Sequence, residues 1–297
     1  MKQSISLKPL YRYTLMTAAA TFLLLIAGSL VTSTDSGLAV PDWPLSYGTW
    51  FPPMVGGILY EHGHRMIAGL VGLMILVLAI WVWRSESRRW VRWLSAAALA
   101  AVFVQALLGG LTVLLLLPPQ ISIAHACLGQ TVFCLIVCLA VCTAPGWEDR
   151  PAPFANVRSA ARLRRLGVAT AFLVAMQLVL GAVIRHTGFA VGWHAVNAAA
   201  LVWVSGSLAA RVKRLRDQAP ITWQHAHRLT MLLGAQLLIG IAVWSHRAVV
   251  WLRTAHVALG ALVLAQSVIL AWELVRRSSS EDELPLVVPE VLVEANS

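Results

Sequence analysis

Four histidines occupy matching positions in two halves of the sequence. His194 follows His64 at almost the same offset in sequence at which His256 follows His125. The surrounding residues repeat as well, since "HACLG" at His125 matches "HVALG" at His256, and "QALLGG" at Gln105 matches "QLLIGI" at Gln236. Two imidazoles that face each other across a helix bundle can hold a haem iron from both sides. The repeat therefore predicts two bis-histidine sites, one in each half.

Two other interpretations compete with a haem site. Each histidine could be an interfacial side chain that is satisfied by water or lipid headgroups. Four of them at repeated offsets favour a functional site, because ionisable groups inside a membrane are costly and usually line a cavity. Zinc is disfavoured, because neither half offers further Cys, Asp or Glu ligands at the same depth.

An acid accompanies only the first histidine. Glu61 lies three residues before His64, so on a helix the two side chains share a face. A carboxylate also favours a helix N-terminus through the dipole, but the second half has no acid at the equivalent place. The first half also has a longer outward connection, the segment "STDSGLAVPDWPLSYGTWFPP", which we expect to cover the site above Glu61. One site thus resembles a plain electron-transfer site, and the other is equipped for chemistry.

The remaining thiols and imidazoles give weaker signals. The four cysteines all lie in one apolar run, where buried thiols are a better interpretation than a metal or iron–sulfur site. They are Cys127, Cys134, Cys138 and Cys142. The sequence leaves open the roles of His62, His186, His225, His227 and His246.

The elements that must position these residues are membrane helices. The chain of 297 residues is 59% hydrophobic and only 12% charged, about half the charged share of a soluble domain. A membrane-spanning helix needs about 20 mainly apolar residues. Eight such runs lie near 13–33, 65–83, 92–117, 121–143, 166–184, 193–210, 228–245 and 249–272. We therefore expect an all-α integral membrane protein of eight transmembrane helices, arranged as two pseudo-repeated four-helix bundles.

The distribution of charge predicts the orientation. The net charge of +10 falls in clusters at both termini and in the even-numbered connections, whereas the first connection carries Asp35 and Asp42 and no basic residue. Basic loops stay in the cytoplasm, so both termini are expected there, and the histidines near the outer, periplasmic side. Clustered charge of this kind argues against nucleic acid as a partner. The expected organisation is a bundle at 1–148, a cytoplasmic linker at 149–165, a bundle at 166–275 and a disordered cytoplasmic tail at 276–297.

At these residues the sequence resembles the haem A synthase family, whose members oxidise haem O to haem A for cytochrome oxidase assembly. The resemblance runs from "GSLVTSTDSGLAVPDWPLSYG" through "EHGHRMIAG", "HACLGQ" and "GAVIRHTG" to "HVALG". It implies that His194 and His256 hold haem b as a cofactor, and that His64 and His125 receive haem O as substrate. The family's essential glutamate corresponds to Glu61. Some members carry cysteines in the outward loops, and this chain has none there.

The resemblance also implies a reaction and its partners. The C8 methyl of haem O would become a formyl group in two successive oxidations through hydroxymethyl haem, with Glu61 handling a proton or water. Four outward arginines are candidates for contact with haem propionates, or are interfacial anchors. They are Arg65, Arg185, Arg247 and Arg253. Haem O would come from haem O synthase (protohaem farnesyltransferase) in the cell inner membrane; the electron acceptor and a homo-oligomeric state stay open.

Two alternatives share the four histidines. A di-haem b-type electron-transfer protein would need no Glu61. A haem O carrier would bind haem reversibly at the first site without forming product. The acid and the extra loop, both confined to the first half, favour the enzyme.

Overall fold

Eight long helices make up the fold in the computed structural model, which describes residues 8–147, 154 and 157–278. The helices are α1 Lys8–Ser33, α2 Gly56–Ser85, α3 Arg89–Leu114, α4 Pro119–Thr143, α5 Val157–Thr187, α6 Val191–Lys213, α7 Pro220–Ser245 and α8 Val250–Ser278. All eight are long and apolar enough to cross a membrane. The prediction of an all-α, multi-pass membrane protein is confirmed.

Most of the helices extend beyond the predicted apolar runs, and two of them enter segments that were expected to lie outside the bundles. α5 begins at Val157, inside the segment expected to be a linker, and α8 continues to Ser278. An apolar run marks only the hydrocarbon core, whereas arginine is a good helix former and prolongs a helix into the headgroup region. Of the tail expected at 276–297, residues 276–278 belong to α8 and the rest lies outside the described residues, as do residues 149–153, 155 and 156 of the expected linker.

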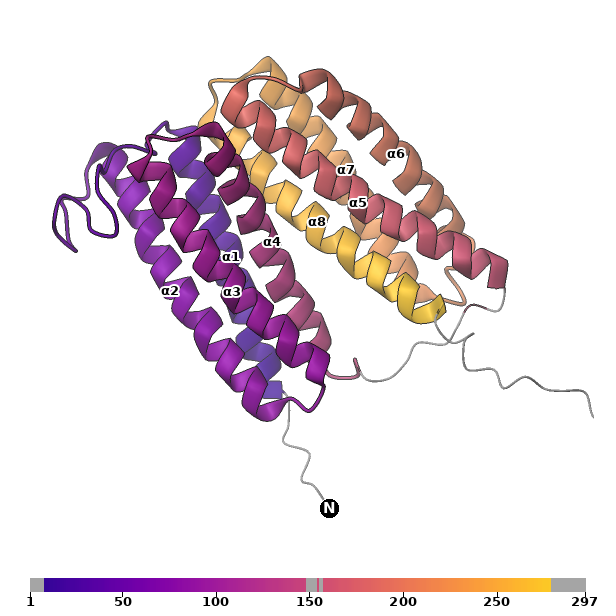
Figure 1. The fold of residues 1–297 in the computed structure, drawn as a ribbon. Coiled ribbons are helices and arrows are strands. Elements are labelled where there is room, and N and C mark those ends of the chain that lie inside the picture. Colours follow the sequence, from indigo (N-terminus) through magenta and orange to yellow (C-terminus); the bar gives the residue numbers. More distant parts are fainter. Residues whose placement is uncertain (1–7, 148–153, 155–156, 279–297) are drawn as a thin grey trace, which may run out of the picture.

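The helices form two bundles that stand side by side (Figure 1). In the first, α1 packs on α2 and α4, and α3 packs on the same two helices; α5 to α8 repeat this arrangement. The bundles meet through α1 and α4 of the first and α5 and α8 of the second, with α4 directly against α8. The two outermost pairs, α2 with α3 and α6 with α7, are therefore farthest from the shared interface.

The pattern of buried residues repeats with the sequence. On α2 the core positions are Val71, Ile75, Leu78 and Val82, and on α6 they are Leu201, Ser205, Leu208 and Val212. Matching core positions are separated by the same offset in sequence as His64 and His194. Both histidines lie seven residues before the first core position, so each belongs to the face of its helix that turns into the bundle. The internal repeat is thus a repeat of structure.

The two bundles differ at the ends that carry the four histidines. Residues 34–55 form a long loop between α1 and α2, whereas only three residues separate α5 from α6. In that loop Trp43 packs against Gly110 near the end of α3, where a Cβ would come within 2.7 Å of the indole. Ile241, the counterpart of Gly110 on α7, is 57% exposed. The loop therefore covers the first bundle in a way that has no equivalent in the second.

Candidate functional site

The four histidines form one pair in each bundle, near the N-terminal ends of α2, α4, α6 and α8. The rings of His64 and His125 are close enough to interact electrostatically. The rings of His194 and His256 interact in the same way. The structure therefore brings together the histidines that the repeat predicted as pairs.

A glycine on the preceding helix packs against each of these imidazoles. A Cβ on Gly28, Gly109, Gly181 or Gly240 would lie 2.9, 3.0, 3.5 and 3.1 Å, respectively, from Cε1 of the facing histidine. The facing histidines are, in the same order, His64, His125, His194 and His256. Without a side chain at these positions, each ring can lie flat against its neighbour helix. The glycines thus let the rings pack closely against the neighbouring helices.

The donor set fits an iron held by two histidines. Each of the four rings has a buried Nδ1 without a hydrogen-bond partner, and a buried polar atom without a partner is costly unless something binds it. Among the described residues no group of three or more His, Cys, Asp or Glu side chains could hold a metal ion. A structural zinc site needs four protein ligands and a catalytic one needs three. A porphyrin iron already has four equatorial nitrogens and needs only the axial pair.

Glutamines from the preceding helices hold three of the four histidines from behind. The Nε2 atoms of Gln105, Gln177 and Gln236 donate to the backbone carbonyls of His125, His194 and His256 at 3.0, 3.0 and 3.1 Å. The Gln105 and Gln236 amides also lie 3.4 Å from Nε2 of the same imidazoles. In the sequence each of these glutamines stands four residues before the glycine that packs against the ring, and this spacing is visible in advance. The partner of the glutamine is a backbone carbonyl, however, and no sequence pattern reveals that contact.

Glu61 is buried and fully engaged at the mouth of the first site. Its Oε1 accepts a hydrogen bond from Nη2 of Arg65 at 2.5 Å, and its Oε2 accepts one from the backbone N–H of Val40 at 2.9 Å. The side chain is 4% exposed. The carboxylate therefore connects the start of α2 to residues 34–55, the covering loop. It also lies in the same N-terminal part of α2 as His64.

The covering loop is fastened to α2 by two more side chains. Arg65 donates to the carbonyls of Asp42 and Leu45 at 2.7 and 2.8 Å. The Oγ of Ser46 lies 2.7 Å from Nδ1 of His62, which is itself buried. The role of His62, which the sequence left open, is thus to hold the loop.

Asp42 organises the tip of this loop. Its carboxylate accepts hydrogen bonds from the backbone N–H groups of Tyr47 and Gly48 at 2.7 and 2.8 Å. Those donors, led by Gly48, hold the pKa of Asp42 below its ordinary value. Both Tyr47 and Gly48 have positive φ, so the turn depends on the carboxylate to gather their N–H groups.

Two of the candidate propionate arginines bridge the bundles. Arg185 of α5 donates to the carbonyl of Thr32, and Arg253 of α8 donates to the carbonyl of Ser33. These carbonyls lie in the last turn of α1, where the helix dipole favours cations. The Nε of Arg253 is buried and has no hydrogen-bond partner. Arg247 instead lies over the ring of Trp244, 4.0 Å from its centroid.

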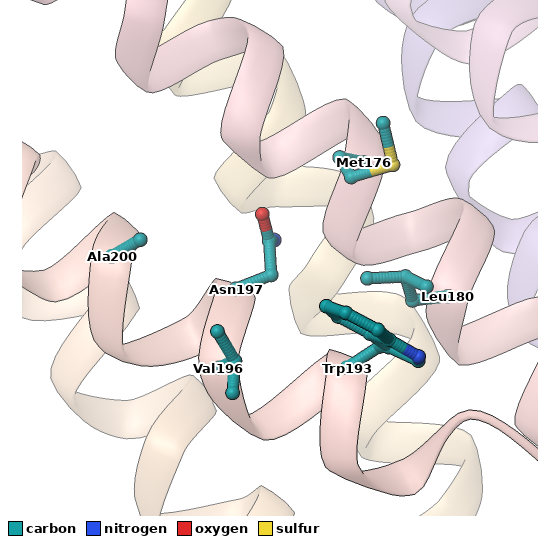
Figure 2. A pocket seen from close by; sticks show the side chains of 6 residues that line it. All are labelled: Met176, Leu180, Trp193, Val196, Asn197 and Ala200. Atoms are coloured by element: carbon teal, nitrogen blue, oxygen red, sulfur yellow. The ribbon is translucent and has the colours of Figure 1, made fainter.

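An apolar hollow of about 290 Å³ opens between α5 and α6 beside the second site (Figure 2). Its lining consists of Met176, Leu180, Trp193, Val196, Asn197 and Ala200. The amide of Asn197 is not free to receive a ligand, because it donates to Gln177 Oε1 at 2.6 Å and to the carbonyl of Leu173 at 3.0 Å. The hollow therefore offers mainly apolar surface, and its amide strengthens the glutamine that holds His194.

Comparison with known proteins supports the family recognised from the sequence. Residues 56–196 match the model of the COX15-CtaA family, described as cytochrome oxidase assembly protein. The heme A synthase of Symbiobacterium thermophilum is 29% identical over 245 residues, which cover 78% of this chain and 74% of that protein. The heme A synthase of Bacillus licheniformis is 25% identical over 82% of this chain and 88% of that protein.

A more similar but shorter match is the heme A synthase of Alkalihalophilus pseudofirmus. It is 40% identical over 106 residues, which cover 34% of this chain and 35% of the relative, so the match spans about a third of the length of each protein. The family model covers α2 and α4 with His64 and His125, and reaches His194 on α6. The chain is therefore similar to the cytochrome oxidase assembly family over residues 56–196 and to heme A synthases over most of its length.

Proposed function

We propose that this protein is a haem A synthase, which oxidises the C8 methyl of haem O to a formyl group in two successive oxidations through hydroxymethyl haem. The observation that carries the proposal is the one-sided chemistry of the first bundle. A buried carboxylate, Glu61, lies one turn from His64 under a covering loop, and the second bundle has neither the acid nor the loop. The relatives named heme A synthase support the same activity.

In this proposal each histidine pair has a different task. His64 and His125 hold the substrate, haem O, while His194 and His256 hold haem b as the resident cofactor. The bound haem b supplies one-electron redox chemistry, with a potential tuned by its axial ligands and its apolar surroundings. The glycines behind the rings would position all four imidazoles, and the three glutamines would hold His125, His194 and His256 in place.

Glu61 supplies the chemistry that the histidines cannot. Arg65 and the N–H of Val40 hold its carboxylate in one orientation at the mouth of the first site. A fixed carboxylate can accept a proton released during oxidation of the methyl group, or hold the water that adds to it. A preorganised negative charge also stabilises positive charge that develops on the substrate. The covering loop excludes bulk water from this step.

The arginines are proposed to receive the propionates. Arg253 is the best placed, because it lies between the bundles and has a buried Nε without a partner. Arg185 lies on the same end of α1 and adds a second positive charge. Arg65 and Arg247 have other contacts, to the covering loop and to Trp244, and we assign them weaker contact with propionates.

The proposed setting follows from the charge pattern of the chain. Both termini lie in the cytoplasm and both haem sites lie towards the outer face of the inner membrane. Haem O reaches the first site through the membrane from haem O synthase. The electrons leave through the second site to an acceptor in the membrane.

Haem extraction tests the function directly. The host lacks haem A and contains haem O synthase, and it expresses the wild-type chain, a Glu61→Gln variant or no protein. We expect a formyl haem or its hydroxymethyl precursor with the wild type, and a loss of about 100-fold or more with Glu61→Gln. Chromatography and the pyridine haemochrome spectrum identify the products. Unchanged haem O with two haem b groups per chain would favour an electron carrier, and reversible haem O binding without product would favour a haem carrier.

A further inference from the structure

The three glutamine contacts follow one structural rule. Gln105, Gln177 and Gln236 each lie four residues before the glycine that packs against the ring. Each reaches the backbone carbonyl of the histidine on the next helix at 3.0–3.1 Å. Space for the amide comes from a small residue four positions after the histidine. At Gly129 and Gly260 an added Cβ would lie 3.1 and 3.4 Å from the glutamine nitrogen.

The fourth histidine breaks the rule. Gly28 packs against His64 as the other glycines pack against their rings, and Ala68 is the small residue four positions after His64. Four residues before Gly28, however, the chain has Leu24, where the other three helices have glutamine. Within the described part of the chain, no side chain donates to the His64 carbonyl and none bonds its ring. Leu24 packs into the apolar core of the first bundle instead. Of the four ligands, His64 is thus the one without a glutamine tether to its neighbour helix.

The polar contacts near His64 lead to the covering loop. His62 and Arg65 flank it and bind Ser46, Asp42 and Leu45 of the loop. The first turn of α2 is therefore connected to a surface segment, whereas α4, α6 and α8 are connected at their histidines to packed helices. Because the contacts of His62 and Arg65 connect the loop to the turn that carries His64, a movement of the loop would also move His64.

We propose that His64 is the exchangeable ligand of the substrate site, and that Leu24 makes it so. This inference rests on the proposed function, in which the first site must admit haem O and release its product while the second keeps haem b. Both iron–imidazole bonds would form as substrate enters and break as product leaves, with no change in oxidation state, and the bond to His64 would be the first to break because His125 is held in place by Gln105. A glutamine at position 24 would hold His64 as the other three histidines are held and would slow this exchange.

Haem transfer to apomyoglobin, a strong haem scavenger, tests the inference in the purified, haem-loaded protein. Leu24→Gln should slow release of haem O from the first site roughly five-fold, the effect of one added hydrogen bond. Leu23→Gln is the matched control, because it places the same amide one residue earlier on α1, at a side chain that is 59% exposed. We expect release from this control to match the wild type. Equal rates in Leu24→Gln and the wild type would overturn the inference.

The reverse substitution keeps the inference testable if Leu24→Gln does not fold. Gln105→Leu gives His125 the surroundings of His64, so it should speed haem O release by a similar factor and increase the five-coordinate, carbon monoxide-binding fraction of the first site. Unchanged release and carbon monoxide binding in this variant would contradict the role of the glutamines. Failure of the proposed function looks different, because the wild type would then form no formyl or hydroxymethyl haem, whatever its rate of haem release.

Discussion

The two bundles share a scaffold and differ at one end. Core positions on α2 and α6 coincide at the offset that relates His64 to His194, and both histidine pairs face inward with a glycine behind each ring. The differences gather around His64 in the first bundle, where the long loop and Glu61 have no counterparts in the second and Leu24 stands in place of Gln177. The repeat therefore supplies the same histidine geometry twice, and a few differences around one histidine distinguish the two sites.

The largest expected effect comes from removing one ligand from each bundle. His256→Ala should eliminate haem from the second bundle, and His125→Ala should eliminate it from the first, because the two pairs do not share a ligand. Haem content per chain would fall from two to one in each variant, as measured by the pyridine haemochrome of the purified protein.

The spectrum identifies which haem remains. Haem b should persist in His125→Ala, and haem O in His256→Ala expressed with haem O synthase. Loss of both haems in either variant would mean that each bundle needs the other, through α4 and α8, to bind its haem. The two sites would then not be independent.

A smaller effect distinguishes the packing of two equivalent glycines. An added Cβ on Gly28 would lie 2.9 Å from the His64 ring, closer than real contacts allow, whereas on Gly181 it would lie 3.5 Å from His194, an ordinary contact. Gly28→Ala should therefore displace the ring and lower haem O occupancy several-fold, while Gly181→Ala should leave haem b in place.

Helix stability does not confound this pair, since alanine is favoured over glycine in a helix interior by about 1 kcal/mol. Haem occupancy and the low-spin signal in electron paramagnetic resonance report the result. Equal losses in the two variants would show that the glycines matter for the bundle as a whole and not for the rings.

Much of the architecture could be predicted because it depends on local pattern. Apolar length specified the helices, and the offsets between histidines identified both the repeat and the pairs. The same reasoning identified Glu61 as exceptional, but not its contacts with Val40 and Arg65, because the path of a covering loop depends on long-range packing. The bonds from Arg185 and Arg253 to the end of α1 join residues 153 and 220 positions apart. Only the packed bundles bring such groups together.

The smallest expected effect concerns the tip of the covering loop and has a defined pH dependence. Backbone donors, led by Gly48, hold the pKa of Asp42 below its ordinary value. The contribution of this carboxylate to loop order is therefore complete above its ordinary pKa and is lost as the pH falls through the lowered value. Asp42→Asn should loosen the loop at neutral pH, with a slight increase in proteolysis within residues 34–55.

Asp35→Asn is the matched control for the loop tip, because this carboxylate is 84% exposed and its ion pair to Arg185 is 3.9 Å long. Asp35 has a positive φ that asparagine tolerates, so the substitution adds no strain to the backbone. Equal cleavage of both variants would show that the loop is held by Glu61, His62 and Arg65, and that its tip does not contribute to covering the substrate site.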